Sequence, residues 1–155
     1  MAAGAWKVFN KAKKYIGNGT LSLSSTTFRL CLCTSASNLK TSASALGLIN
    51  RTSLTGQVTS TTGMPLLGEA LAGEIWTATS AASPTYKFDV TDLVITASSS
   101  AIANIKYAVI FLTGDSAGSQ KLLCYSTLTT SQITSLAIGN TLTIQMASGG
   151  VLTLT

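Results

Sequence analysis

One apolar stretch, residues 105–112, constrains the fold of this 155-residue chain more than any other part of it. It is the longest apolar run that is rich in β-favouring residues, and its composition suits a strand better than a helix. In a strand, alternate side chains point to opposite faces, so Val109 and Phe111 share one face, and Ala108 and Ile110 share the other. A strand that is apolar on both faces has to be covered on both sides, which predicts a central strand of a sheet.

Other segments alternate in the same way, at a spacing of roughly ten residues and with turn residues between them. This pattern predicts a mainly β protein, folded as an antiparallel β-sandwich or a jelly-roll-like barrel. The central strand should pair with a return strand over 120–128, whereas 97–104 and 129–138 are expected to be connections. A change of parity at Thr91 and Asp92 predicts a bulge or a short bend. The remaining strands are expected at 20–24, 27–34, 74–80, 86–90, 93–95, 141–146 and 151–155, the first two as a hairpin.

The strongest helical pattern lies near the N-terminus, over residues 5–16. Apolar residues such as Val8 and Ala12 recur there at helical spacing, lysines occupy the opposite face, and Gly17 is well placed to end the helix. We therefore predict two parts, an N-terminal helical arm over residues 1–17 and a single β-sandwich domain over 18–155. The apolar face of the helix packs either on the sheet or on a neighbouring subunit.

A long excursion, residues 35–73, interrupts the strand pattern. It is rich in Ser, Thr, Ala and Gly and only weakly periodic, and Pro65 argues against a central strand there. Long loops of this kind in compact domains are usually functional or lie against something else. We expect the excursion to project from the domain, to carry one or two short strands, and to contact a partner.

The surface of the chain is expected to be unusually poor in charge. Hydrophobic residues make up 46% of the sequence and charged residues only 10%, compared with about 25% charged residues in a typical soluble domain. The polar surface must then be built mostly from Ser and Thr, which protects weakly against association. This composition suits an extracellular or particle-bound β protein, or a protein whose surface is buried in an assembly, and we favour the assembly.

The net charge of +5 is concentrated near the N-terminus. Lys7, Lys11, Lys13 and Lys14 supply four of the ten basic residues, and the rest of the chain is close to neutral. Such a segment is either a solvated helix face or an arm that meets an acidic surface. A nucleic-acid-binding protein would carry more arginine, more widely spread charge and stacking aromatic residues, so we expect no nucleic-acid partner.

The residue types needed for common catalytic sites are scarce. The chain has no histidine, which excludes a Ser-His-Asp or Cys-His nucleophile system within it. Its three cysteines form no CxxC pair and are expected to be small core residues. A glycosidase pair could be drawn from the five carboxylates, but we expect no enzyme, no cofactor, no metal site and no small-molecule substrate. The residues concerned are Cys31, Cys33, Cys124, Glu69, Glu74, Asp89, Asp92 and Asp115.

Neither a membrane span nor a secretion signal is expected. No apolar run approaches about 18 residues, and lysines interrupt the N-terminal apolar pattern. We therefore expect no membrane partner and synthesis in a cytoplasm.

Six blocks of the sequence form a recognisable set of strand and turn patterns. They are residues 5–20 (AWKVFNKAKKYIGNGT), 27–38 (TFRLCLCTSASN), 106–111 (KYAVIF), 122–125 (LLCY), 139–145 (GNTLTIQ) and 149–154 (GGVLTL). Together they resemble a family of small structural proteins of tailed bacteriophages. The resemblance covers both ends and most of the second half, and it is weak between residues 35 and 73. It carries no catalytic residues.

The resemblance implies a virion component, in first place a capsid decoration or cement protein made in the cytoplasm of the bacterial host. Such a protein would bind the outside of the shell and bridge neighbouring coat subunits. Its partners would be the major capsid protein and copies of itself, as a dimer or trimer. The expected contact residues are Trp6, Lys7, Phe9, Lys11, Lys14, Tyr15, Met64 and Trp76.

Two alternatives remain open at this stage. The chain could be a neck, tail or fibre component of the particle, or a module that binds host glycans. The glycan-binding alternative predicts that Trp76 or Tyr86 is exposed beside polar groups in a groove.

Overall fold

The structure is a computed structural model of the chain. It describes residues 4–24, 28–41, 47–58, 64–65, 67–80, 83–113, 119–129 and 133–154. These residues form antiparallel sheets and one short α-helix near the N-terminus, which confirms the predicted mainly β fold class. The further expectation of a closed sandwich or barrel stays a prediction.

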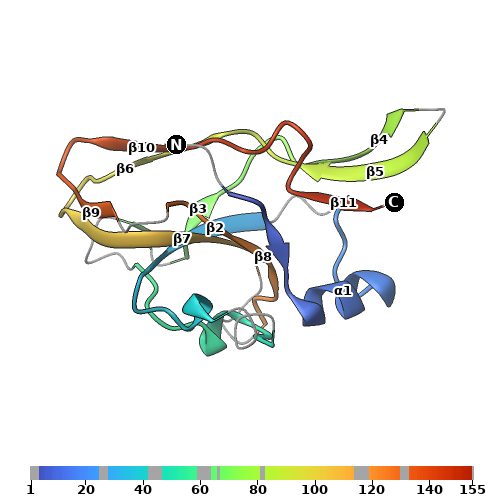
Figure 1. Cartoon of the computed structure of the whole chain (residues 1–155), viewed down its shortest axis with the longest axis horizontal. Helices are drawn as coiled ribbons and strands as arrows, with labels where there is room; N and C mark the ends of the chain where they lie inside the picture. Colours follow the sequence, from blue (N-terminus) through green and yellow to red (C-terminus); the bar gives the residue numbers. More distant parts are fainter. Residues whose placement is uncertain are drawn as a thin grey trace.

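The elements follow one another along the chain in the order shown in Figure 1. The strands are β1 (Lys7–Val8), β2 (Phe28–Thr34), β3 (Glu69–Ala70), β4 (Ile75–Ser80), β5 (Ser83–Asp89), β6 (Leu93–Thr96), β7 (Ile102–Leu112), β8 (Leu122–Thr127), β9 (Ile133–Leu136), β10 (Thr141–Ile144) and β11 (Leu152–Leu154). The helices are α1 (Asn10–Gly17) and two short 3-10 helices, η1 (Asn38–Lys40) and η2 (Arg51–Ser53).

The largest sheet has six strands and is organised around β7. Its order is β1-β8-β7-β2-β3, with β9 pairing the beginning of β7. Val109 of β7 lies between Cys31 of β2 and Tyr125 of β8, which confirms both the central position of this strand and its predicted return partner. Residues 107–111 are buried, so the chain itself covers both faces of β7.

The strand β7 is longer than predicted, because a second apolar pair extends it. Ile102 lies opposite Leu136 and Ile105 lies opposite Ile133. Ile102 and Ile105 are both fully buried, and β9 covers them from within a segment predicted to be a connection. The predictions that 97–104 and 129–138 contain no strand are therefore wrong.

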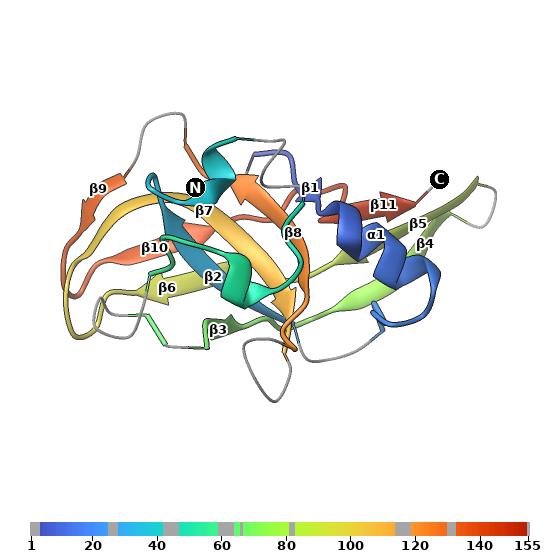
Figure 2. The same cartoon turned by 90° about the horizontal axis from the view of Figure 1, so that it is seen from below.

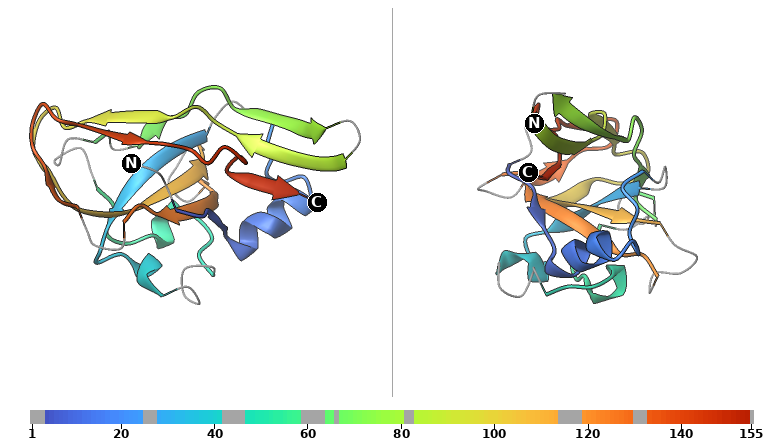
Figure 3. Two further views of the ribbon diagram at one scale, coloured as in Figure 1. Left: turned by 45° about the horizontal axis from the view of Figure 1, so that its top comes forward. Right: turned by 90° about the vertical axis from the view of Figure 1, so that its right-hand side faces the viewer.

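Two smaller sheets lie along the other side of the molecule. One has the order β11-β5-β4, and the other pairs β10 with β6. Figure 3 shows these two sheets following one another along the same side of the molecule. The change of parity at Thr91 and Asp92 marks the passage from one sheet to the next, because β5 pairs with β4 and β11 whereas β6 pairs with β10. It is not a bulge within one strand.

The core lies between the six-stranded sheet and the two smaller sheets. Phe28 of β2 packs on Phe88 of β5, with 4.9 Å between the ring centroids. Ile95 of β6 and Ile144 of β10 are also fully buried. Alternate residues of these strands therefore point into one apolar interior.

The described residues of the excursion between 35 and 58 pack against the other face of the six-stranded sheet, whereas β3 joins the edge of that sheet. Arg51 of η2 lies over the ring of Phe111, and Leu39, Leu54 and Val58 are buried. The guanidinium of Arg51 donates hydrogen bonds to Oε1 of Gln57 and to Oε1 of Gln120. The expectation of a projecting excursion is therefore wrong for these residues, since burial of its aliphatic side chains holds it on the sheet. Residues 42–46, 59–63 and 66 of this excursion lie outside the described residues.

The N-terminal segment differs from the predicted continuous helix. Residues Lys7–Val8 form β1 on the edge of the sheet, and the helix begins only at Asn10. The backbone N–H of Phe9 donates to the carbonyl of Leu123 in β8, at 3.1 Å. The residues just before the helix are therefore hydrogen-bonded to the sheet. Phe9 is fully buried and stacks near Tyr125. The division into an arm over residues 1–17 and a domain over 18–155 stays a prediction.

Residues 20–24 form turns rather than the expected strand, so the predicted hairpin with β2 is wrong. The side chain of Asn18 accepts a hydrogen bond from the backbone of Thr20, and the backbone of Leu21 donates to Tyr15. Leu21 and Leu23 are buried, which explains their alternation without a strand.

Candidate interaction surfaces

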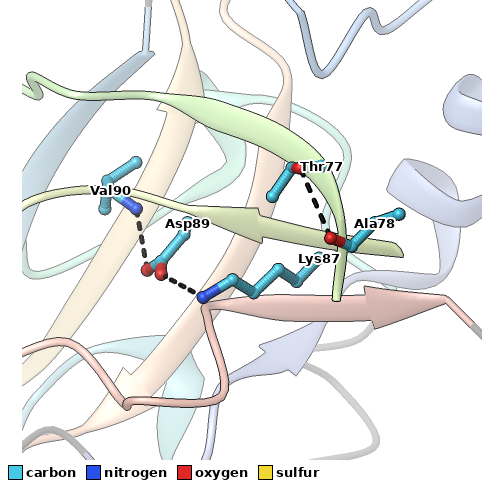
Figure 4. A network of polar contacts seen from close by, with 5 residues as sticks. All are labelled: Thr77, Ala78, Lys87, Asp89 and Val90. Atoms are coloured by element: carbon cyan, nitrogen blue, oxygen red, sulfur yellow. Dashed lines mark hydrogen bonds and ion pairs between the residues drawn. The ribbon is translucent and has the colours of Figure 1, made fainter. Parts of the chain in front are cut away.

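Two of the five carboxylates that could support catalysis, Asp89 and Asp92, make local structural contacts, and Asp115 lies outside the described residues. Asp89 forms an ion pair with Lys87, at 3.0 Å, and accepts a hydrogen bond from the backbone of Val90, as Figure 4 shows. Asp92 accepts a hydrogen bond from the backbone of Met146, at 2.8 Å. Among the described residues, no group of three His, Cys, Asp or Glu side chains is placed to hold a metal ion.

The cysteines are buried free thiols, as the sequence predicts. A hydrogen bond with Cys31, followed by burial, raises the pKa of the Cys33 thiol well above its ordinary value. Burial alone raises the pKa of Cys124 in the same way. Both groups are therefore neutral thiols at physiological pH, and burial keeps them away from oxidants and metal ions.

The predicted contact residues fall into three groups. Phe9 and Met64 are buried in the core, so neither side chain lies on the surface of the isolated chain. The aromatic residues Trp6, Tyr15 and Trp76 are half-buried against the core. The third group, exposed lysines of the N-terminal segment, consists of Lys7, Lys11 and Lys14.

One candidate surface is the outer face of the two smaller sheets. Threonines dominate it, and its one charged pair is the neighbouring Lys87 and Asp89, among the residues that the structure describes. Two aliphatic side chains stand out of this face, Ile75 with 54% and Val94 with 57% of its surface exposed. The exposed threonines on these strands are Thr77, Thr96, Thr141 and Thr153.

A second candidate surface is a groove between α1 and the inner face of the three-stranded sheet. Its central hollow has a volume of about 380 Å³ and is lined mainly by Val8, Ile16, Leu23, Trp76 and Leu152. Figure 2 shows α1 beside β11, β5 and β4 at this end of the molecule. Two further hollows adjoin it, one beside Leu21 and the other beside Gly149. We call the three hollows together the helix–sheet groove.

The groove exists because the helix is anchored elsewhere. Phe9 and Ala12 attach α1 to the six-stranded sheet, and Phe9 lies 5.3 Å from Tyr125 between ring centroids. Ile16 and Trp76 consequently face each other across the groove without filling it. Trp76 also stacks on Tyr86, with 5.8 Å between the ring centroids, and Tyr86 keeps 43% of its surface exposed.

Sequence reasoning missed several residues of these surfaces. Leu152, Ile75 and Val94 were not singled out as surface residues. The alternation in β4 and β6 does assign Ile75 and Val94 to the face opposite Trp76 and Ile95, so their exposure could have been inferred. No pattern in the sequence indicates the groove, because the groove depends on the distance between α1 and strands that are remote from it in the sequence.

Comparison with known proteins adds no evidence on the fold or on the candidate surfaces. The chain matched no protein-family model, no curated protein and no solved structure. None of the helices within the described ranges is long and apolar enough to cross a membrane.

Proposed function

We propose that this chain is a non-enzymatic structural protein of a bacteriophage particle, which decorates the outer surface of the capsid and stabilises contacts between coat subunits. The observation that carries this proposal is the charge-poor, threonine-rich outer face with Ile75 and Val94 exposed. Such a face costs little to desolvate and offers hydroxyl groups for hydrogen bonds across an interface.

A protein that bridges two coat subunits needs two contact surfaces. The outer face and the helix–sheet groove lie on opposite faces of the same three-stranded sheet, because Ile75 points away from the groove and Trp76 lines it. A standard protein–protein interface buries about 1,600 Å² in total, and many copies on one shell add avidity. The resemblance to phage structural proteins supplies the identity of the partner, and the major capsid protein and further copies of this chain are the proposed neighbours.

Copy number in purified particles tests this proposal. Quantitative mass spectrometry of particles from a host that produces the chain should find it in numbers comparable with the coat protein. Far fewer copies than the coat protein would indicate a component of the neck, tail or fibre instead. Absence from the particles would refute a structural role altogether.

Substitutions of two exposed aliphatic residues test whether the outer face is a contact surface. Val94→Glu places a charge on the outer face and should lower occupancy on the shell. Ile138→Glu alters a residue with 61% of its surface exposed, in the turn before β10, and serves as the matched control. Equal occupancy for the two variants would exclude the outer face as a contact surface.

The stack of Trp76 on Tyr86 supports one alternative, a module that binds host glycans. Exposed aromatic rings form platforms for sugar rings, and Tyr86 is exposed beside Trp76, which lines the groove. The neighbouring lining is mainly apolar, which suits a protein partner better than a hydroxyl-rich sugar. Binding of the isolated chain to a glycan array, abolished by Tyr86→Ala, would establish the alternative.

A further inference from the structure

The helix–sheet groove is elongated, because three hollows adjoin through shared residues. The central hollow shares Ile16, Leu23 and Trp76 with a neighbour on one side. It shares Val8, Leu152 and Thr153 with a neighbour on the other side. The line of hollows therefore runs from the turn after α1 to the turn before β11. This shape fits an extended chain that places alternate side chains in successive hollows.

The charge on the groove has one sign. Among the described residues that line the three hollows, Lys13 is the charged one, and no carboxylate lines any of them. Three further lysines, Lys7, Lys11 and Lys14, lie exposed on the same N-terminal segment. An occupant with carboxylates beside its apolar residues would complement this surface.

One end of the groove also holds a hydrogen-bond donor without a partner. The indole N–H of Trp6 is buried and has no hydrogen-bond acceptor within the described part of the chain, and Trp6 lines the third hollow. Buried donors are usually paired, and a peptide offers a carbonyl oxygen at every residue.

We propose that the helix–sheet groove binds an extended polypeptide segment in which apolar residues alternate with acidic ones. This inference deepens the proposed function and rests on it for the source of the segment, which is the coat protein. The apolar side chains occupy the hollows, Lys13 pairs with a carboxylate, and a backbone carbonyl accepts the Trp6 N–H.

Intrinsic fluorescence reports on this groove selectively. The chain contains two tryptophans, and both of them line the groove. The probes are blocked peptides of about nine residues, roughly 30 Å long when extended, in which Glu alternates with Val, Leu or Phe. Twin peptides carry Lys in place of Glu. The acidic peptides should shift the emission saturably and bind at least ten-fold more tightly than their Lys twins.

A matched pair of charge reversals tests the role of Lys13. Lys13→Glu should weaken binding of the acidic peptides about five-fold, because one pairing becomes a repulsion. Lys40→Glu changes the net charge by the same amount at an exposed site in η1, outside the groove lining, and should leave the affinity unchanged. Equal losses in both variants would show that net charge, rather than the groove, attracts the peptides.

Two glycines allow the central hollow and the third hollow of the groove to be blocked separately. Gly17 lines the central hollow and Gly149 lines the third hollow, and a Cβ atom on either would meet nothing within 4 Å. Gly17→Phe and Gly149→Phe should each weaken peptide binding at least ten-fold without changing the urea midpoint of unfolding.

Three results would overturn the inference. The first is the absence of a saturable fluorescence shift with every acidic peptide. The second is loss of binding in Gly17→Phe alone together with full competition by decanoate, which would indicate a compact amphiphile. The third is a self-associated chain that Gly17→Phe converts to monomers, which would make a second copy the occupant. None of these results affects the copy-number test, so the inference and the proposed function can fail separately.

Discussion

Phe28 and Phe88 join the two sides of the molecule, with their ring centroids 4.9 Å apart and their planes inclined by 54°. Phe28 belongs to the six-stranded sheet and Phe88 to the three-stranded sheet, and at most 1% of either residue is exposed. Phe88→Ala should lower the free energy of unfolding by about 3–5 kcal/mol, because it leaves a cavity between the sheets.

Tyr86 provides the control for that experiment, because it lies two residues earlier on β5 and remains 43% exposed. Tyr86→Ala should cost only about 1 kcal/mol, mostly from the lost stack on Trp76. Urea titration followed by circular dichroism measures both variants. Similar losses for the two would show that the sheets are held together elsewhere.

Arg51 is the second stability determinant that can be tested. It is only 7% exposed, it donates to the side chains of Gln57 and Gln120, and it lies 5.2 Å from the ring centre of Phe111. Arg51→Met keeps much of the apolar stem but removes both donors from buried amide oxygens. We expect a loss of about 2–4 kcal/mol in the free energy of unfolding.

The exposed Lys40 serves as the control for Arg51. Lys40→Met removes a positive charge from the same excursion and should change stability by less than about 0.5 kcal/mol. Chemical denaturation with a common slope for all variants measures the difference. A neutral result for Arg51→Met would mean that the polar network contributes no net stability.

Gly68 and Gly139 form a matched pair of glycines with positive φ, at +72° and +83°. A Cβ at Gly68 would lie 2.5 Å from the carbonyl oxygen of Leu30, whereas a Cβ at Gly139 would meet nothing within 4 Å. Gly139→Ala should cost about 1 kcal/mol from backbone conformation alone. Gly68→Ala should cost roughly 2–3 kcal/mol more, because β2 or the loop before β3 has to shift. Thermal unfolding of the two variants checks this order, and a larger loss at Gly139 would contradict it.

The stability of the chain should fall at alkaline pH. The pKa values of Cys33 and Cys124 are raised in the folded state, whereas an exposed thiol in the unfolded chain ionises near pH 8.5. Above that pH the unfolded state binds fewer protons than the folded state, so the free energy of unfolding decreases as pH rises. Both thiols contribute to this decrease, which should continue until the pH reaches their raised pKa values in the folded state.

Denaturation under reducing conditions between pH 7 and pH 10 measures that slope. The double variant Cys33→Ala and Cys124→Ala should start from a lower stability at pH 7 and show a shallower decline. An unchanged slope in the double variant would assign the alkaline loss to other groups. Tyr107 is one such group, because burial, and to a lesser extent Tyr125, raises its pKa as well.

Much of the strand pattern could be predicted from alternation, because alternation records which side chains face the interior. It placed β7 at the centre of a sheet, paired it with β8, and identified the buried cysteines. Alternation gave wrong predictions where the buried residues of one structure have the spacing that is typical of another. Leu21 and Leu23 alternate because a turn buries both of them, and helical spacing around Val8 concealed a short edge strand.

The surfaces were harder to predict than the core. Phe9 and Met64 looked like contact residues because aromatic residues and methionine suit interfaces as well as cores, and only tertiary packing distinguishes the two. The groove depends on the distance between α1 and β11, two elements that are remote in sequence. The parity change at Thr91 was visible in the sequence, but its meaning required knowing which strands pair.

The contact between Gly4 and Ser126 spans 122 residues of the chain, with the Ser126 hydroxyl donating to the Gly4 carbonyl at 2.8 Å. An emerging polypeptide cannot close this edge of the sheet until β8 has left the ribosome. The helix–sheet groove forms later still, because Val8 lines one side of it and Leu152 lines the other. Contacts between such distant segments slow folding and leave apolar strands exposed during synthesis. The same order of events withholds the complete groove from every unfinished chain, so that a truncated product that lacks Leu152 cannot present it.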